Sequence, residues 1–409
     1  MVVYGMAVGF CVSRRSLLLV SLLVVVLFSS LFACMFVNDS SAASLENAVH
    51  VKSEEELKNA MDNAPTGKST IIALDNDITL TSTTDDHNSN YYPVSIIIPA
   101  DKDITLTSNK ASGYYKLNGA VNGTILHIVP NGVLRIDGVG VIHTSNTGGG
   151  GVCVYTFAEF YLYGGIISTN KAYGGHGVTN YGLFVMSGGE ITGNTDENGG
   201  GVWNSGTFSM SGGTISGNNA ADYGGGVHNA YRGVFTMSGG IISDNTADYG
   251  GGVHLVYSEF TMSGGTISSN TATQWGGGVY NGDTFIMAGG KIIDNAAKLG
   301  GGVYNSHDFT MSGGTISSNT ADHGGGVYNE PYPSLTVFNR LGGVISDNTA
   351  TNSYNDVYSD NSADGLANGN NGSSSEGFSL RNFLITCVLT AVVAMCIVLV
   401  VLTFRLKKD

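Results

Sequence analysis

The stretch GGGVWNSGTFSMSGGTISGNNAADY, residues 199–223, is one unit of a repeat that fills the middle of this 409-residue chain. The valine that follows the glycines recurs from unit to unit, with steps of 26, 24, 25, 26, 26, 24 and 24 residues. These valines are Val152, Val178, Val202, Val227, Val253, Val279, Val303 and Val327. A fixed period of about 20–50 residues predicts stacked copies of one supersecondary unit.

Other positions of the unit recur in the same phase. Each unit has an isoleucine, with a Gly-Gly pair ahead of it and an asparagine three residues after it. The isoleucines are Ile167, Ile191, Ile215, Ile242, Ile267, Ile292, Ile316 and Ile345, and the asparagines run from Asn170 to Asn348. Phe-x-Met occupies the middle of most units. The three runs Val-x-Asn, Phe-x-Met and x-Ile-Ser alternate with period two, which predicts short strands rather than helices.

Three strands per unit, repeated in phase, predict a parallel β-helix in which each unit is one coil. Like strands would pair from coil to coil at ~4.8 Å, so eight coils would give a rod of roughly 38 Å. We expect the glycines at corners whose backbone excludes a Cβ atom. We expect the asparagines to bond to turn backbone and to one another along the stack. A single coil cannot offset the entropy of ordering its own residues, so stacked neighbours must stabilise it.

Composition excludes several classes of protein. There are 60 glycines but six prolines and no G-X-Y period, which excludes collagen and argues against low-complexity disorder. Between residues 44 and 380 the chain has 12 Lys/Arg against 30 Asp/Glu, a net charge of −18. Such an acidic body argues against a nucleic-acid partner. Cys153 is the one cysteine between the two apolar ends, so no intramolecular disulfide is expected in the body.

Both ends carry targeting patterns. Residues 1–43 combine two arginines, an apolar run and a small-residue site, which predicts a secretory signal peptide, with an uncleaved signal anchor as the alternative. Residues 383–404 are apolar and uncharged and are followed by basic residues at 405–409. This arrangement predicts one transmembrane helix, a cytoplasmic tail and an extracellular N-terminal portion. Residues 359–382 are rich in Ser, Gly and Asn and predict a flexible stalk.

The body divides into two parts. Residues 44–148 are expected to hold irregular β-helix coils and a capping helix, and residues 149–358 the regular repeats. The helix is predicted from Ser53 and Glu56, which form a capping box, and from Leu57 and Met61, which follow at helical spacing. We expect this helix to lie over the first coil, because an open end of a β-helix invites edge pairing.

The repeats resemble those of the right-handed parallel β-helix superfamily, the pectin lyase-like fold. In particular, GGG-V-x-N and GG-x-I-x-x-N resemble the repeats of prokaryotic adhesin-like surface proteins. They are also similar to polymorphic outer-membrane-protein repeats, although Phe is followed here by x-Met-Ser rather than x-x-Asn. The resemblance covers residues 49–358. It implies an all-β, right-handed parallel β-helix, but this fold hosts lyases, hydrolases and passive stalks alike.

Two aromatic-rich stripes are the candidate binding residues. The residue after each valine and the residue before each glycine group are expected to point outward on either side of the glycine corner. The candidates are Trp203, Tyr223, Tyr249, Trp275, Tyr280, Tyr304 and Tyr328. Exposed aromatic rings bind sugar rings or protein partners, while the alternative is that they pack on one another as ladders.

Signals for catalysis are weak. The coil length is nearly constant, which leaves little room for the cleft that the enzymes of the resembled superfamily build from long loops. Asp222, Asp248 and Asp322 recur at one position and are interpreted as solvated turn residues, with a cation site as the alternative. His228 and His254 could together bind a metal, but two ligands make only a weak site. We therefore predict no catalytic residues, no metal and no cofactor.

The expected function is that of a membrane-anchored, adhesin-like surface protein, with a carbohydrate or a surface protein as partner along the rod. Two alternatives stay open: a membrane-tethered polysaccharide lyase or glycoside hydrolase, and a purely structural envelope stalk.

Overall fold

The computed structural model describes residues 45–83, 93–120, 122–143, 149–171, 176–331 and 336–359. The predicted signal peptide at 1–43, membrane helix at 383–404 and tail at 405–409 lie outside these residues, as does the stalk at 359–382 apart from its first residue. Within the described residues, no helix is both long enough and apolar enough to cross a bilayer.

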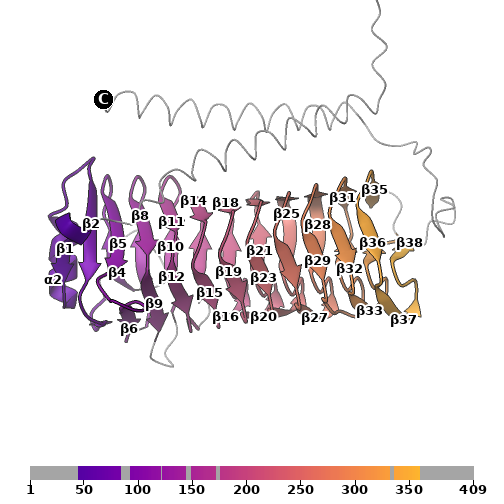
Figure 1. The fold of residues 1–409 in the computed structure, drawn as a ribbon, viewed down its shortest axis with the longest axis horizontal. Coiled ribbons are helices and arrows are strands. Elements are labelled where there is room, and N and C mark those ends of the chain that lie inside the picture. The colour runs from indigo at the N-terminus through magenta and orange to yellow at the C-terminus, as the bar shows by residue number, and fades with distance from the viewer. Residues whose placement is uncertain are drawn as a thin grey trace, which may run out of the picture. The chain divides into compact units, whose positions relative to one another are not determined.

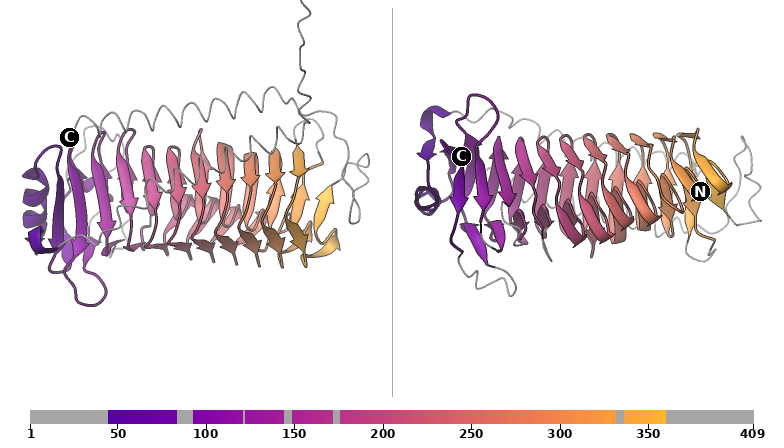
Figure 2. Two further views of the ribbon diagram at one scale, coloured as in Figure 1. Left: turned by 45° about the horizontal axis from the view of Figure 1, so that its top comes forward. Right: turned by 90° about the horizontal axis from the view of Figure 1, so that it is seen from below.

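The described residues form an all-β parallel solenoid of about 11 turns, as the period-two repeats predict. Successive coils stack along one axis, and corresponding strands lie side by side (Figures 1 and 2). We name the rows of strands after their inward residues: a valine row, a phenylalanine row, an isoleucine row and a shorter alanine row. The chain passes through them in that order within each regular coil.

The valine row confirms the predicted Val-x-Asn strands. Val202 pairs in register with Val178 on one side and with Val227 on the other. Its strands are β4 (Val94–Ile98), β7 (Thr124–Ile128), β10 (Val152–Val154), β13 (Val178–Asn180), β17 (Val202–Asn204), β21 (Val227–Ala230), β25 (Val253–Met262), β28 (Val279–Met287), β30 (Val303–Asn305), β34 (Val327–Asn329) and β38 (Val357–Ser359). The strands β25 and β28 continue without a break into the phenylalanine row.

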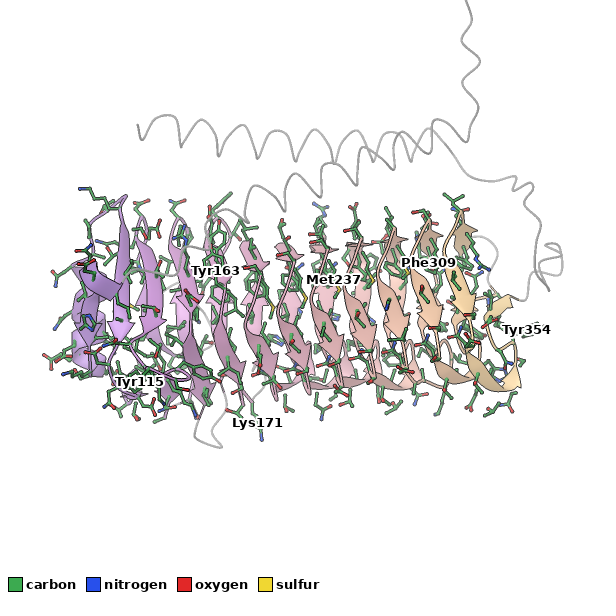
Figure 3. All side chains as sticks on the ribbon, in the orientation of Figure 1. Tyr115, Tyr163, Lys171, Met237, Phe309 and Tyr354 are labelled. Carbon is green, nitrogen blue, oxygen red and sulfur yellow. The ribbon has the colours of Figure 1, made fainter. Side chains whose placement is uncertain are left out.

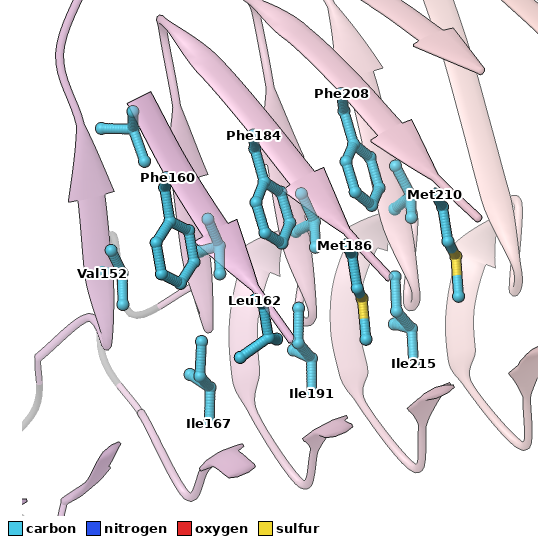
Figure 4. Packing of buried hydrophobic residues seen from close by; sticks show 14 of the residues in the cluster. Val152, Phe160, Leu162, Ile167, Phe184, Met186, Ile191, Phe208, Met210 and Ile215 are labelled. Atoms are coloured by element: carbon cyan, nitrogen blue, oxygen red, sulfur yellow. The ribbon is translucent and has the colours of Figure 1, made fainter. Parts of the chain in front are cut away.

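The phenylalanine row confirms the predicted Phe-x-Met strands. Phe160, Phe184 and Phe208 stack inside the coil with ring centroids 5.0 and 4.6 Å apart (Figure 4). Besides β25 and β28, the strands are β1 (Val49–Val51), β2 (Ser69–Leu74), β5 (Asp103–Ser108), β8 (Val133–Asp137), β11 (Glu159–Leu162), β14 (Leu183–Met186), β18 (Thr207–Met210), β22 (Val234–Met237), β31 (Asp308–Met311) and β35 (Val337–Arg340). Figure 3 marks Met237 and Phe309, two fully buried members of this row.

The isoleucine row is a sheet of 11 strands. They are β3 (Ile78–Leu80), β6 (Lys116–Gly119), β9 (Val139–His143), β12 (Gly165–Ser168), β15 (Glu190–Thr192), β19 (Thr214–Ser216), β23 (Ile241–Ser243), β26 (Thr266–Ser268), β29 (Lys291–Ile293), β32 (Thr315–Ser317) and β36 (Val344–Ser346). Each repeat isoleucine from Ile191 to Ile316 is fully buried between its neighbours.

The alanine row was not predicted. It comprises β16 (Thr195–Asn198), β20 (Asn219–Tyr223), β24 (Thr246–Tyr249) and β27 (Thr271–Trp275), with β33 (Thr320–His323) and β37 (Thr349–Ser353) as a separate pair. Asp222, Asp248 and Asp322 therefore lie in strands, and their interpretation as turn residues is wrong. The row forms because a small residue such as Ala220 or Ala247 turns inward there and is nearly fully buried. Alanine has low strand propensity, so its alternation is a faint signal.

The glycines have two different structural reasons. Gly213 has a φ of +80°, the left-handed geometry that we expected at corners. Gly201 has no such φ, but a Cβ there would lie 2.5 Å from the carbonyl oxygen of Gly226 in the next coil. This second type of glycine is required by the close approach of neighbouring coils, not by the backbone conformation.

The asparagines behave as predicted. From Asn170 to Asn348, each side-chain Nδ2 donates to the Oδ1 of the next asparagine at 2.7–3.0 Å. The same Oδ1 also accepts from the backbone N–H of the preceding asparagine, as Asn270 does from Asn245 at 3.0 Å. We call this series the asparagine ladder. It satisfies buried polar groups at one corner of each regular coil.

A short 3₁₀ helix, η2 (Leu45–Asn47), and one α-helix, α2 (Glu54–Asp62), precede the regular coils. The Ser53 Oγ accepts from the backbone N–H of Glu56 at 3.2 Å, as the capping box predicts. The Glu56 carboxylate accepts from the N–H of Lys52 rather than from that of Ser53. Leu57 and Met61 are buried, and α2 lies at the N-terminal end of the solenoid (Figure 1).

Candidate binding surface

One outward column of side chains runs along the valine row. It contains Trp203, His228, His254, Tyr280, Tyr304, Tyr328 and Tyr358, one per coil and paired in register. The column exists because each of these residues follows an inward valine, and successive side chains of a strand point to opposite faces. We call it the valine-row column.

A second column runs along the alanine row and consists of Tyr223, Tyr249 and Trp275. Its rings contact those of the valine-row column. Tyr223 lies 4.8 Å from His254, and Trp275 lies 4.9 Å from Tyr304, between ring centroids. From Tyr223 to Tyr328 the two predicted stripes are therefore one continuous aromatic surface across the glycine corner. It contains six of the seven predicted residues, whereas the ring of Trp203 contacts His176, Tyr181 and Tyr231 instead.

The seven residues differ in exposure. Tyr223 is 37% exposed, and Trp203, Tyr249, Trp275, Tyr280 and Tyr328 are half-buried. Tyr304 is only 2% exposed, because its neighbours cover it on both sides. Tyr304 therefore points out of the coil, as expected of the residue after a valine, but it is closed to solvent.

The tyrosines of the valine-row column stack face to face. Tyr280, Tyr304, Tyr328 and Tyr358 follow one another at centroid distances of 5.2, 5.3 and 4.5 Å, with interplanar angles of 10°, 6° and 3°. Ring-on-ring packing, the alternative raised from the sequence, is the arrangement here. Stacked rings cover one another's faces, so this part of the surface offers ring edges rather than faces to a ligand.

Two buried histidines interrupt the tyrosines. The rings of His228 and His254 lie 5.0 Å apart, both are at most 6% exposed, and neither Nδ1 has a hydrogen-bond partner in the described structure. Burial lowers the pKa of His228 to about 3, and it also lowers the pKa of His254. No group of three or more His, Cys, Asp or Glu able to hold a metal occurs in the described ranges.

Burial also changes the tyrosine hydroxyls. It raises the pKa of Tyr280 and of Tyr304, and the nearby Glu330 carboxylate raises the pKa of Tyr304 further. Both phenols therefore stay neutral and keep their ability to donate hydrogen bonds at any physiological pH.

Sequence reasoning missed a set of exposed aromatics at the corner between the valine and phenylalanine rows. Phe157, Tyr181, Tyr231 and Tyr257 are 79%, 42%, 68% and 73% exposed. They follow their repeat valines by 5, 3, 4 and 4 residues, so no fixed offset aligns them. With Trp203, which contacts both Tyr181 and Tyr231, they form a set that we call the aromatic corner.

Carboxylates also lie on the outer side of the phenylalanine row. Glu259 and Asp308 both pair in register with Thr284, one coil away on either side. Burial raises the pKa of both carboxyls, and the Asp283 charge raises them further. Among the described residues, these are the two carboxyl groups whose pKa is raised, which is the shift that a general acid requires.

Comparisons with known proteins do not assign the chain to a family. No protein-family model matches the chain, and no curated protein and no solved structure matches it.

Proposed function

We propose that the protein is a membrane-anchored, adhesin-like surface protein whose β-solenoid binds a carbohydrate or a surface protein along its length. The observation that carries this proposal is the continuous aromatic surface, which spans successive coils and is partly open to solvent. Aromatic side chains are enriched at binding surfaces because they combine a large apolar area with polar tips.

Anchoring is part of the same proposal and is supported by the sequence. The signal peptide at 1–43 would direct export, and the apolar run at 383–404 would hold the protein in the membrane with residues 405–409 inside. Removing residues 383–409 should then release the protein into the medium of expressing cells. Retention of the truncated protein in the membrane fraction would contradict the anchor.

Binding itself is tested with the full chain purified in detergent. It should bind a subset of an array of glycans and surface proteins, and salt should weaken binding only modestly, because aromatic contacts depend little on screening. Absence of binding to every ligand on the array would favour the structural stalk and overturn the proposal.

A glycoside hydrolase is the second candidate, and Glu259 with Asp308 is the observation that favours it. Two coils separate these residues, so their backbones are about 9.6 Å apart at ~4.8 Å per coil. Inverting enzymes place two carboxyl groups about 6.5–9.5 Å apart, one of them with a raised pKa, so the two side chains must lean toward each other to reach this range. Release of reducing ends from a bound polysaccharide, lost in Glu259→Gln, would establish this activity. Equal release by wild type and Glu259→Gln would exclude this pair.

The N-terminal helix α2 is proposed to cap the first coil. Its buried residues Leu57 and Met61 pack at the end of the core, and its Glu54 carboxylate accepts from the N–H of Thr81 beside β3. A covered end cannot pair with the edge of another molecule. Leu57→Asp should therefore produce concentration-dependent association through exposed strand edges, which size-exclusion chromatography would detect. A monomeric, folded Leu57→Asp would argue against the cap.

A further inference from the structure

The aromatic corner is a single file of rings on five consecutive coils. Phe157 precedes β11, Tyr181 follows β13, Trp203 lies in β17, Tyr231 follows β21 and Tyr257 lies within β25. The coils carry these residues in sequence order, one ring per coil. At ~4.8 Å per coil the file is roughly 19 Å long.

Three of these aromatics have strained backbones. Phe157, Tyr231 and Tyr257 have φ values of 67°, 52° and 49°, a conformation that bulky L residues rarely adopt. At the corner occupied by Phe157, the two preceding coils carry Asp101 and Asn131, also with positive φ. Asp and Asn tolerate this conformation, so the fold does not require an aromatic there. Backbone strain that the fold does not require is a mark of functional positions.

Among the described residues no ring stacks on Phe157, Tyr181, Tyr231 or Tyr257, whereas Trp203 stacks on His176 with an interplanar angle of 17°. Tyr181 and Trp203 are tilted by 59°, and Trp203 and Tyr231 by 44°, whereas stacked tyrosines of the valine-row column differ by at most 10°. A tilted pair cannot cover both faces of either ring. The high exposure of Phe157, Tyr231 and Tyr257 agrees with this geometry.

We propose that the aromatic corner binds an uncharged polysaccharide chain that lies parallel to the solenoid axis. The proposal rests on the function proposed above and specifies its site and ligand class. A file one residue wide suits a linear polymer, since a protein partner needs a broad patch with a buried centre. Aromatic faces suit the apolar faces of pyranose rings, and the chain's net charge of −14 disfavours an anionic polymer.

Strain supplies a variant that separates binding from folding. In Phe157→Asn, Tyr231→Asn, Tyr257→Asn, each ring is removed and each left-handed position receives a residue that tolerates it. We expect the triple variant to keep or raise its unfolding temperature. Its affinity should fall at least about tenfold, the equivalent of 1.4 kcal/mol. The matched control is Tyr354→Asn, which makes the same substitution at an exposed tyrosine with a positive φ of 56° that lies outside the aromatic corner.

The measurement is retardation of the full chain in native gels cast with hydroxyethyl cellulose, galactomannan or laminarin, and with alginate as the anionic comparison. Retardation of wild type and of the control by an uncharged polymer, lost in the triple variant, supports the proposal. Equal retardation of all three proteins would leave the proposed function intact and overturn the site. Retardation by alginate alone would overturn the ligand class. If no uncharged polymer retards wild type, the site proposal is overturned, and if the glycan and protein array also yields no ligand, the proposed function itself fails.

Discussion

At the residue scale, one corner position shows how the repeat tolerates local strain. The residue between the isoleucine strand and the ladder asparagine has a positive φ in every regular coil. It is glycine in two coils, Gly193 and Gly217, and there a Cβ would meet nothing closer than 3.5 Å. In other coils it is a polar residue, such as Ser269 or Ser318. Conformation rather than space therefore decides which residue fits best at this corner.

This corner leads to the first prediction. Ser269→Gly and Ser318→Gly should each raise the free energy of unfolding by up to about 1 kcal/mol, because glycine adopts positive φ without steric cost. The denaturant midpoint of each variant measures the effect. Ser268→Gly is the control, since it lies in β26 with ordinary strand geometry, and it should lower the midpoint. A fall in the midpoint of Ser269→Gly would contradict the strain argument.

At the element scale, the asparagine ladder is a directed chain of hydrogen bonds. Each amide donates toward the C-terminal end, and the last one, Asn348, donates to the carboxylate of Asp356 at 3.0 Å. At the other end, the Oδ1 of Asn170 is buried and receives no bond from the described residues. Every internal member both donates and accepts, so the loss of one leaves several buried groups unpaired.

Substitution within the ladder should therefore be costly. Asn270 accepts from the N–H and Nδ2 of Asn245 and donates to Ile242 O and Asn295 Oδ1. We expect Asn270→Ala to lose at least about 3 kcal/mol in unfolding free energy, since each orphaned buried group costs ~1–3 kcal/mol. Urea denaturation gives the value. The exposed Asn219→Ala should change stability by no more than about 0.5 kcal/mol, and similar losses for both would show that ladder position is unimportant.

The buried histidine pair makes stability depend on pH. The folded state holds His228 and His254 with lowered pKa values, so between the unfolded value near 6.5 and the folded value the unfolded chain binds more protons. The stability that depends on neutral His228 and His254 is therefore fully present above pH 6.5 and is lost as the pH decreases. Burial also lowers the pKa of His176, which adds to this trend, although the Asp196 carboxylate 3.4 Å from its Nδ1 opposes that shift. A charge on His176 would lower the pKa of His228 further.

Below pH 6.5 the free energy of unfolding should fall by up to about 1.4 kcal/mol per pH unit for each buried histidine. In His228→Tyr, His254→Tyr the tyrosine column is completed and the loss between pH 6.5 and 5 should be much smaller. Melting temperature measured across this range tests the difference. Parallel curves for wild type and the double variant would assign the pH dependence to other groups.

At the scale of the whole molecule, stability comes from stacking of like coils. Each regular coil repeats the same inward side chains, and Trp275 and Leu299 form a parallel bridge at equivalent positions of neighbouring coils. Joining Trp275 to Gly300 would therefore reproduce a junction that the native chain already contains between Trp275 and Gly276. Repeat proteins of this type gain stability approximately coil by coil.

Deleting residues 276–299, one complete coil, should give a folded but less stable protein with an unchanged β-type circular dichroism spectrum. Deleting residues 276–287, half a coil, should unfold the following coils, because valine strands would then meet isoleucine strands. The spectra and urea midpoints of both deletions test this expectation. If both deletion variants fold equally well, the stability of the solenoid does not depend on the pairing of equivalent strands in neighbouring coils.

Much of the fold was predictable because inward positions repeat with strong chemical identity. Val, Phe-x-Met and Ile each mark a strand, and the ladder asparagines mark a corner. The alanine row escaped prediction, since Ala247 and its equivalents are small and carry a weak strand preference. The aromatic corner escaped as well, because loops of unequal length place Tyr181 and Tyr257 at different offsets from their valines.

The repeat pattern is enough to predict the architecture, since a period of 24–26 residues with alternating apolar positions can bury its core only by stacking coil on coil. It also determined which aromatic columns face outward on the strands. Which rings keep a free face, however, depends on how neighbouring coils pack and could not be predicted from the repeat. Tyr280, Tyr304 and Tyr328 come into register and cover one another, while Phe157 and Tyr231 lie at corners where no ring of the described residues stacks on them. Exposure of a ring depends on contacts between coils, and these are absent from the local pattern of any one repeat.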